Sequence, residues 1–291
     1  MHSDGSHIPE LLIVVWTALV GAVVGSFLNV VIARVPKGES IVHPRSRCPR
    51  CKTAIAWYDN IPLLSWVWLR ARCRSCHARI SARYPLVEVL GAGAALVAFG
   101  RHGLSGTAAA EFAFAAALIA LAFIDIDTWL LPNAITWPLI AFGLVMGWLG
   151  VTPAGSARWA LYGAGLGFAA FGLLAWLGEK VLRKEALGFG DVWLLAGLGG
   201  WMGPPALLPV VLLASIQGSV VGLVLLALGR GEPGPSPTSS DTGTPAESRE
   251  DDWVPPKHAV PFGPFLVAGA LEWLWLGGLL ARAVPVLQLF R

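Results

Sequence analysis

Charged residues are scarce in this chain: Asp, Glu, Lys and Arg make up 13% of its 291 residues. Soluble globular domains carry about 25%. Here 55% of the residues are hydrophobic and the mean hydropathy is +0.65. This composition excludes an ordinary soluble domain and indicates an integral membrane protein. The first apolar run, from Leu11, lacks a basic segment before it, since Asp4 and Glu10 precede it. We therefore expect a retained transmembrane helix there, not a cleaved signal peptide.

Long apolar runs fill most of the sequence. About 20 apolar residues cross a bilayer as a helix, so the sequence predicts an all-α polytopic membrane protein with about eight transmembrane helices. The sixth is short, and Gly203-Pro204-Pro205 separates it from the seventh. The eight candidate segments are roughly 11–33, 84–100, 108–126, 132–150, 158–180, 191–202, 205–229 and 262–286.

Two polar stretches interrupt these runs, and they divide the chain. Residues 229–252 contain almost no apolar side chains and many Pro, Ser and Gly. Such a stretch cannot bury a core, so we expect a disordered loop there. The resulting parts are a first transmembrane helix (1–35), a loop module (36–83), a transmembrane bundle (84–228), a disordered cytoplasmic loop (229–260) and a last transmembrane helix (261–291).

Positive charge is concentrated in the loop module. Eleven of the 21 Lys and Arg residues lie between Arg34 and Arg83. Such a stretch could bind nucleic acid, but between two membrane helices it first indicates a cytoplasmic loop. We therefore expect contact with membrane lipid and no nucleic-acid partner. Strict alternation of the spans then puts Asp125, Asp191 and the basic cluster at 180–184 on the same, cytoplasmic side.

Cysteine is rare, and all four cysteines lie in the loop module. They form two C-x-x-C pairs, Cys48 with Cys51 and Cys73 with Cys76. This spacing predicts a tetrahedral four-thiolate zinc site. Four protein ligands leave no open coordination position, so the metal would be structural and would supply folding free energy to a loop with little core. The alternative is two disulfides, which need the oxidising side of the membrane; the basic loop argues against that location.

Two aspartates lie beside apolar runs, where a carboxylate costs free energy and marks a candidate functional site. Asp125 ends the third predicted span. Asp191 begins the sixth, behind Gly188 and Gly190. Glycines leave room for another chain beside the backbone, and a helix beginning at Asp191 would stabilise its charged form. The alternative is that each aspartate is a helix cap or an interfacial residue.

Asp127 lies only two positions after Asp125, so on a helix the two side chains point about 200° apart. At most one of them can face the bundle interior. We favour Asp125, which lies deeper, and expect Asp127 to meet water or to cap the next helix. Two carboxylates brought close in a low dielectric share one proton. The ionised one can activate water as a general base, and the neutral one can protonate the amide that is cleaved.

A few other polar residues lie within the predicted spans. Ser26 and Asn29, on the first helix, are typical of contacts that join transmembrane helices; the alternative is a direct contact with substrate or cofactor. Glu88 is expected to be a structural partner of an arginine such as Arg83, with a catalytic role as the alternative.

Six stretches, in their order along the chain, resemble the bacterial type IV prepilin peptidases, membrane aspartyl proteases of the GxGD class. The resemblance covers nearly the whole chain. Each motif alone is weak, but the six in this order are highly specific. They are "GSFLNVVIARVP" (25–36), the paired C-x-x-C loop, "ISARYPLVEVLGA" (80–92), "IDIDTWLLPN" (124–133), "GFGDVWLLAGLGGWMG" (188–203) and "PFGPFLVAGA" (261–270).

The resemblance implies positions for a catalytic pair. Aligned on the aliphatic-Pro pair Leu131-Pro132, the family's first catalytic aspartate falls on Asp125, not Asp127. The second falls on Asp191, with Gly188 and Gly190 as supporting residues.

The resemblance also implies substrates and a second reaction. The substrates would be prepilins or pseudopilins of type IV pilus or type II secretion systems, with a short basic leader before an apolar helix. They would be cut at the cytoplasmic face of the bacterial inner membrane. Family members typically then N-methylate the new amino terminus with S-adenosylmethionine, an activity associated with the N-terminal half and its zinc loop. The sequence has no glycine-rich loop after a strand, so it nominates no residues for the methyl donor.

Two other functions stay open. An ion-coupled transporter could use Asp125 and Asp191 as a proton relay, although we find no internal repeat of the kind such carriers show. A non-enzymatic scaffold could dock partners through the zinc module, in which case Asp191→Asn would be harmless. The sequence does not say which prepilins are cut, whether methylation occurs, what the oligomeric state is, or what residues 229–252 do.

Overall fold

The computed structural model describes residues 10–182, 188–228 and 260–290, and within them it is built from helices. The loop predicted to be disordered at 229–260 lies almost wholly outside the described residues. No strand occurs in the described part of the chain; two isolated bridges, Arg47 with Ala54 and Arg72 with Arg79, are the only extended pairings there. The helices are α1 (Glu10–Arg34), α2 (Leu64–Trp68), α3 (Arg83–His102), α4 (Gly106–Thr128), α5 (Asn133–Trp148), α6 (Ala157–Leu177), α7 (Phe189–Met202), α8 (Pro204–Ala227) and α9 (Gly263–Ala283).

All eight apolar segments predicted from the sequence are helices, namely α1 and α3 to α9. Among the described residues, six of these helices are long and apolar enough to cross a membrane. The other two are shorter: α5 has 16 residues and α7 has 14. The prediction of an all-α polytopic membrane protein is confirmed.

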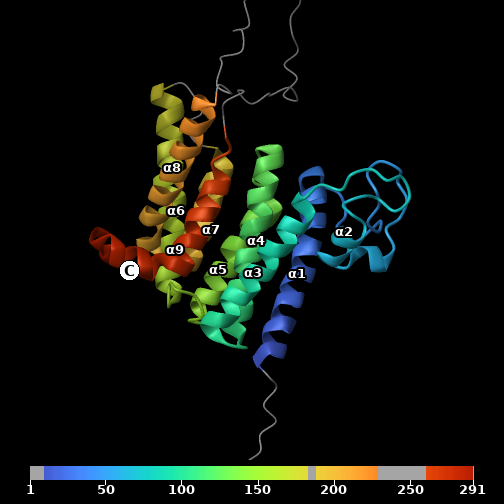
Figure 1. The fold of residues 1–291 in the computed structure, drawn as a ribbon. Helices are drawn as coiled ribbons and strands as arrows, with labels where there is room; N and C mark the ends of the chain where they lie inside the picture. The colour runs from blue at the N-terminus through green and yellow to red at the C-terminus, as the bar shows by residue number, and fades with distance from the viewer. Residues whose placement is uncertain (1–9, 183–187, 229–259, 291) are drawn as a thin grey trace, which may run out of the picture.

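The long helices stand side by side, and the loop module projects beside the C-terminal end of α1 (Figure 1). The C-terminal ends of α4, α6 and α8 and the N-terminal ends of α3, α7 and α9 lie at that same end of the bundle. The two predicted site aspartates, near the end of α4 and the start of α7, therefore share one end of the protein with the module.

Small residues bring α1 and α3 into backbone contact. A Cβ added to Gly21 would lie 2.6 Å from the Gly91 carbonyl oxygen, and one added to Gly25 would lie 2.7 Å from the Glu88 Cα. One turn further along the same stripe, the Asn29 side chain donates a hydrogen bond of 3.1 Å to the Tyr84 carbonyl oxygen. This agrees with the expectation that Asn29 joins helices, and the contact fixes α1 against the first turns of α3.

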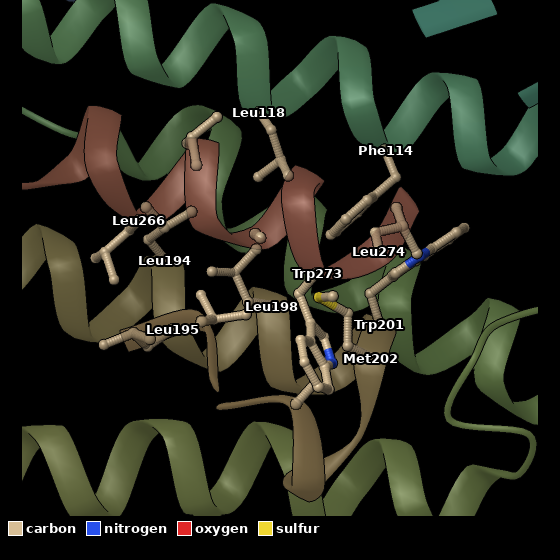
Figure 2. Close-up of a cluster of buried hydrophobic side chains, with 14 of the residues drawn as sticks. Phe114, Leu118, Leu194, Leu195, Leu198, Trp201, Met202, Leu266, Trp273 and Leu274 are labelled. Carbon is tan, nitrogen blue, oxygen red and sulfur yellow. The ribbon is translucent and has the colours of Figure 1, made fainter. Parts of the chain in front are cut away.

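The core of the bundle lies between α4, α7 and α9 (Figure 2). Its largest buried side chain, Trp201, stacks on Phe114 with ring centroids 4.5 Å apart and on Phe142 at 5.5 Å. Leu194, Leu195 and Leu198 of α7 are fully buried in the same cluster. Because α7 is buried along its length, the position of its first turn is determined by packing.

Candidate active site and metal centre

Asp125 is one of few charged groups buried in the bundle, with 5% of its surface exposed. It lies in the last turn of α4. The helix ends there because Trp129 adopts a left-handed conformation (φ 57°) and its N–H donates to the Asp125 carbonyl oxygen at 2.9 Å. Leu130, Leu131 and Pro132 then carry the chain to α5. The site residue is thus held on a packed helix beside a sharp turn.

Asp191 lies in the first turn of α7 and is 8% exposed. Gly188 precedes the helix in an extended conformation, and the Asp191 N–H donates to the Gly188 carbonyl oxygen at 3.0 Å. A Cβ at Gly188 would lie 3.8 Å from the Asp191 Oδ2. The carboxylate therefore lies against glycine backbone at a helix N-terminus, where the helix dipole favours negative charge.

The surroundings of these two carboxylates meet at Leu131. The Leu131 side chain contacts Gly190, next to Asp191, and Gly263, next to Asp125. It lies 2.9 Å from a Cβ built on Gly190 and 3.5 Å from one built on Gly263. Gly263, the first residue of α9, touches Asp125 directly, because a Cβ there would lie 2.5 Å from the Asp125 Oδ2. Three helix ends, of α4, α7 and α9, thus converge on one acidic site.

Gly263 and Leu131 are parts of the site to which the sequence analysis gave no role. Both lie in stretches quoted there, "PFGPFLVAGA" and the aliphatic-Pro pair. A glycine at the start of a helix after a long polar loop is a weak signal on its own. Its contact with Asp125 depends on how α9 packs beside α4.

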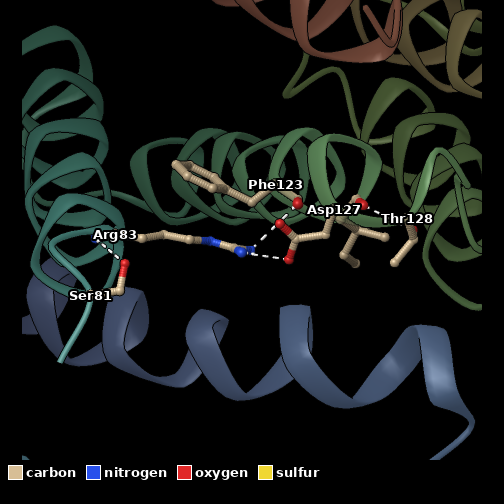
Figure 3. Close-up of polar contacts among 6 residues, drawn as sticks. Ser81, Arg83, Phe123, Asp127 and Thr128 are labelled. Atoms are coloured by element: carbon tan, nitrogen blue, oxygen red, sulfur yellow. Dashed lines mark hydrogen bonds and ion pairs between the residues drawn. The ribbon is translucent and has the colours of Figure 1, made fainter. Parts of the chain in front are cut away.

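Asp127 points away from Asp125, as the helical spacing predicts, but it does not cap α5. It forms an ion pair with Arg83 of α3, with Nη1 and Oδ2 2.5 Å apart (Figure 3). The Arg83 guanidinium also donates to the Phe123 carbonyl oxygen at 3.4 Å and lies over the Phe123 ring. This contact fastens the N-terminal end of α3 to the last turn of α4.

The expected pairing of Arg83 with Glu88 is wrong. Glu88 is 8% exposed and accepts a hydrogen bond of 2.7 Å from the backbone N–H of Leu63 in the loop module. The two side chains leave α3 in different directions, because Arg83 faces α4 and Glu88 faces the module.

The four cysteines converge into one cluster. All four Sγ atoms lie within 4.8 Å of one another, and the cysteines are free thiols, so the disulfide alternative is not seen. The Cys48 and Cys76 sulfurs are 3.8 Å apart, and those of Cys51 and Cys73 are 4.0 Å apart. Four sulfurs about 2.3 Å from a tetrahedral ion would be separated by about 3.8 Å. The cluster could therefore bind a metal ion.

The two halves of the metal centre have the same backbone geometry. In each, the first cysteine N–H donates to the carbonyl five residues on: Cys48 to Thr53 at 2.9 Å and Cys73 to Ala78 at 2.8 Å. The residue after each second cysteine, Lys52 or His77, has a positive φ and donates to the first cysteine's carbonyl. Two matching turns thus present two sulfurs each to a common centre.

Fold and sites together define a multi-pass membrane protein with a four-cysteine module and a buried pair of aspartates. Comparison with known families adds two matches: residues 19–102 match the Bacterial Peptidase A24 N-terminal domain, and residues 112–223 match the Type IV leader peptidase family. The chain belongs to the type IV leader peptidase family.

Curated relatives match over nearly the full chain. The prepilin leader peptidase/N-methyltransferase of Myxococcus xanthus is 42% identical, over 94% of this chain and 93% of the relative. A type 4 prepilin-like proteins leader peptide-processing enzyme of Escherichia coli is 39% identical, over 89% and 92%. The prepilin leader peptidase/N-methyltransferase of Pseudomonas aeruginosa is 35% identical, over 91% of each chain. No solved structure gives a significant match. These matches give no support to the transporter alternative.

Proposed function

We propose that this protein removes the leader peptide of type IV prepilins or pseudopilins, with Asp125 and Asp191 as the catalytic pair. The observation that carries the proposal is the convergence of two buried aspartates, from helices far apart in the sequence, on one glycine-lined site. The names of the relatives support the substrate class. Gly188 and Gly190 are supporting residues of this site.

The chemistry requires the two carboxylates to hold one proton between them. The ionised carboxylate accepts a proton from water as the water attacks the scissile carbonyl, and the neutral one donates a proton to the carbonyl oxygen. The proton accepted from water then passes to the leaving nitrogen. Gly263 lets the start of α9 lie directly against Asp125, Gly190 lets the start of α7 lie against Leu131, and Gly188 keeps a side chain away from the Asp191 carboxylate.

The location of the site fits a substrate with a basic leader and an apolar helix. We infer that the module end of the bundle faces the cytoplasm of the bacterial inner membrane, because eleven of the 21 Lys and Arg residues lie between Arg34 and Arg83. The junction between a basic leader and an apolar helix would lie at that interface. The substrate helix would stay in lipid while its leader reaches the aspartates.

We further propose that the protein N-methylates the new amino terminus, as the relatives' names suggest, and that the cysteine cluster holds structural Zn²⁺. Cys48, Cys51, Cys73 and Cys76 match zinc in ligand type, number and spacing. S-adenosylmethionine, when bound, would supply an electrophilic methyl group on a positively charged sulfur.

The test is an intact-mass assay on purified protein in lipid nanodiscs, with a prepilin and isotopically labelled S-adenosylmethionine. The wild type should yield a substrate that lacks its leader and has gained one labelled methyl group. Asp125→Asn and Asp191→Asn should each leave the leader in place. Glu272→Gln is the matched control, because Glu272 is a membrane carboxylate that binds Gln217 away from the site. If both aspartate variants cleave like the wild type, the assigned pair is wrong.

A further inference from the structure

A cavity of about 660 Å³ lies between the loop module and the module-side ends of α1 and α3. Pockets for small-molecule ligands are typically about 300–1,000 Å³. Its walls come from three parts of the chain: Ser26 and Asn29 of α1, Tyr58 and Trp66 of the module, and Tyr84 and Glu88 of α3. The peptidase site does not use this cavity. Its wall residues lie in three of the motifs quoted above, at 25–36, in the paired C-x-x-C loop and at 80–92, which come together only when the module folds back onto the two helices.

Two carboxylates line this cavity, and their surroundings differ. Asp59 accepts hydrogen bonds from Arg74 Nε at 2.8 Å and Nη2 at 2.5 Å, and these bonds hold the pKa of Asp59 below its ordinary value. Glu88 is buried and has no ion pair within the described residues; the bond it accepts there comes from the neutral Leu63 N–H. Arg83, the nearest arginine in sequence, is held by Asp127.

A buried carboxylate without a positive partner is costly, and it attracts a cation that enters the same low-dielectric space. The cavity offers the complementary features for the rest of a nucleoside-containing ligand. Tyr58 and Trp66 give aromatic surface for a base to pack on, and Arg47 and Arg79 offer donors for a carboxylate. A ligand with a positive centre, an aromatic base and a carboxylate matches this set of groups.

We propose that this cavity binds the methyl donor, S-adenosylmethionine, with Glu88 facing its positively charged sulfonium end. The inference rests on the proposed methyl-transfer activity. For the transfer itself, the new terminal ammonium first releases a proton to water. The nitrogen lone pair then forms the N–C bond, and the C–S bond breaks with its electrons remaining on sulfur. The products are a methylated ammonium and a neutral thioether, so Glu88 loses its cationic partner and the spent donor is held less strongly.

The test compares two ligands that differ in the positive charge on sulfur. Full-length protein in nanodiscs is titrated calorimetrically with S-adenosylmethionine and with the neutral S-adenosylhomocysteine. Glu88→Gln keeps an amide oxygen to accept the Leu63 N–H but removes the charge. We expect Glu88→Gln to weaken binding of S-adenosylmethionine about tenfold and to change binding of S-adenosylhomocysteine less than about twofold. Glu272→Gln, the control carboxylate, should leave both affinities unchanged.

A second variant tests the cavity without touching Glu88. Ala33 is an exposed residue of α1 on the cavity wall, so Ala33→Phe should fill part of the space and weaken both ligands. Val23→Phe, on an exposed face of the same helix outside the cavity, is its matched control. Metal content and leader cleavage of all variants report whether the module and the bundle remain folded.

Different outcomes would refute the proposed methyl transfer and the assignment of this cavity as the donor site. If the wild type binds no donor and adds no methyl group, methyl transfer itself is refuted and this inference falls with it. If the wild type binds and methylates, but Glu88→Gln and Ala33→Phe bind both ligands like their controls, the donor site lies elsewhere. A Glu88→Gln variant that loses equal affinity for both ligands would overturn the charge recognition assigned to Glu88.

Discussion

Substituting Gly263 by alanine should slow leader cleavage without unfolding the protein. Gly263 begins α9 and has no positive φ, so its backbone accepts alanine. The added Cβ, however, would lie 2.5 Å from the Asp125 Oδ2 and 3.1 Å from its Cγ. Real Cβ contacts are at least 3.0 Å, so the carboxylate must move by 0.5 Å or more (3.0 minus 2.5). Because an error of about 1 Å in the position of a reacting group can cost about 100-fold in rate, we expect kcat to fall by about 10- to 100-fold.

The assay is single-turnover cleavage of a prepilin by purified protein in nanodiscs, read by intact mass. Gly218→Ala is the matched control at the α8–α9 contact, because its Cβ would meet the Phe265 ring at an ordinary 3.5 Å. Exchange of a glycine in a helix interior for alanine stabilises the helix by about 1 kcal/mol, so Gly218→Ala should not lose thermal stability. Gly263 is the first residue of α9, and we expect Gly263→Ala to remain folded because only the Asp125 carboxylate has to move. Wild-type cleavage by Gly263→Ala would refute the contact between Gly263 and the Asp125 carboxylate, or the role proposed for that carboxylate.

Three further perturbations address the surroundings of the two sites. Asp127→Ala should lower kcat about two- to fivefold, since a half-exposed ion pair contributes about 1 kcal/mol at most; the double exchange Arg83→Asp with Asp127→Arg should recover part of that loss, and no recovery would mean that the pair does not position Asp125. Purified protein should contain one zinc ion per chain by mass spectrometry, and protein purified without metal would contradict the zinc assignment. A strong chelator should expose the module to protease before leader cleavage declines. Gly25→Leu should lower the unfolding temperature by about 2–6 °C because it separates α1 from α3. Gly93→Leu, the control, has open space around it and should not lower the unfolding temperature. Equal changes in unfolding temperature would mean that close packing at Gly25 is unimportant.

The sequence predicted those features that depend on local composition. The eight apolar segments are helices because a long apolar run in a membrane has to satisfy its backbone hydrogen bonds internally. The cysteine cluster could also be predicted, because each C-x-x-C pair forms the same local turn without help from the rest of the chain. The ends of α7 followed from Gly188 and Gly203, which flank it.

Features that depend on packing between distant segments could not be predicted. Arg83 was assigned to Glu88, its neighbour in the sequence, but the orientation of α3 turns the two side chains toward different partners. The role of Gly263 depends on the approach of α9 to the end of α4. The resemblance associated methylation with the N-terminal half, but the sequence did not predict the cavity itself, because α1, the module and α3 each contribute only part of its wall.

We infer that cleavage and methylation occur at two separate sites, on different sides of α3. Arg83 connects one side of this helix to the last turn of α4, which carries Asp125, whereas Tyr84 and Glu88 line the cavity beside α1 and the module. The new amino terminus would therefore have to move from the aspartates to the cavity between the two reactions. Accordingly, Asp191→Asn should still methylate a substrate supplied without its leader, at a rate near that of the wild type, because its donor cavity is intact. Loss of methylation by this variant, with donor affinity unchanged, would mean that both reactions use the aspartate site.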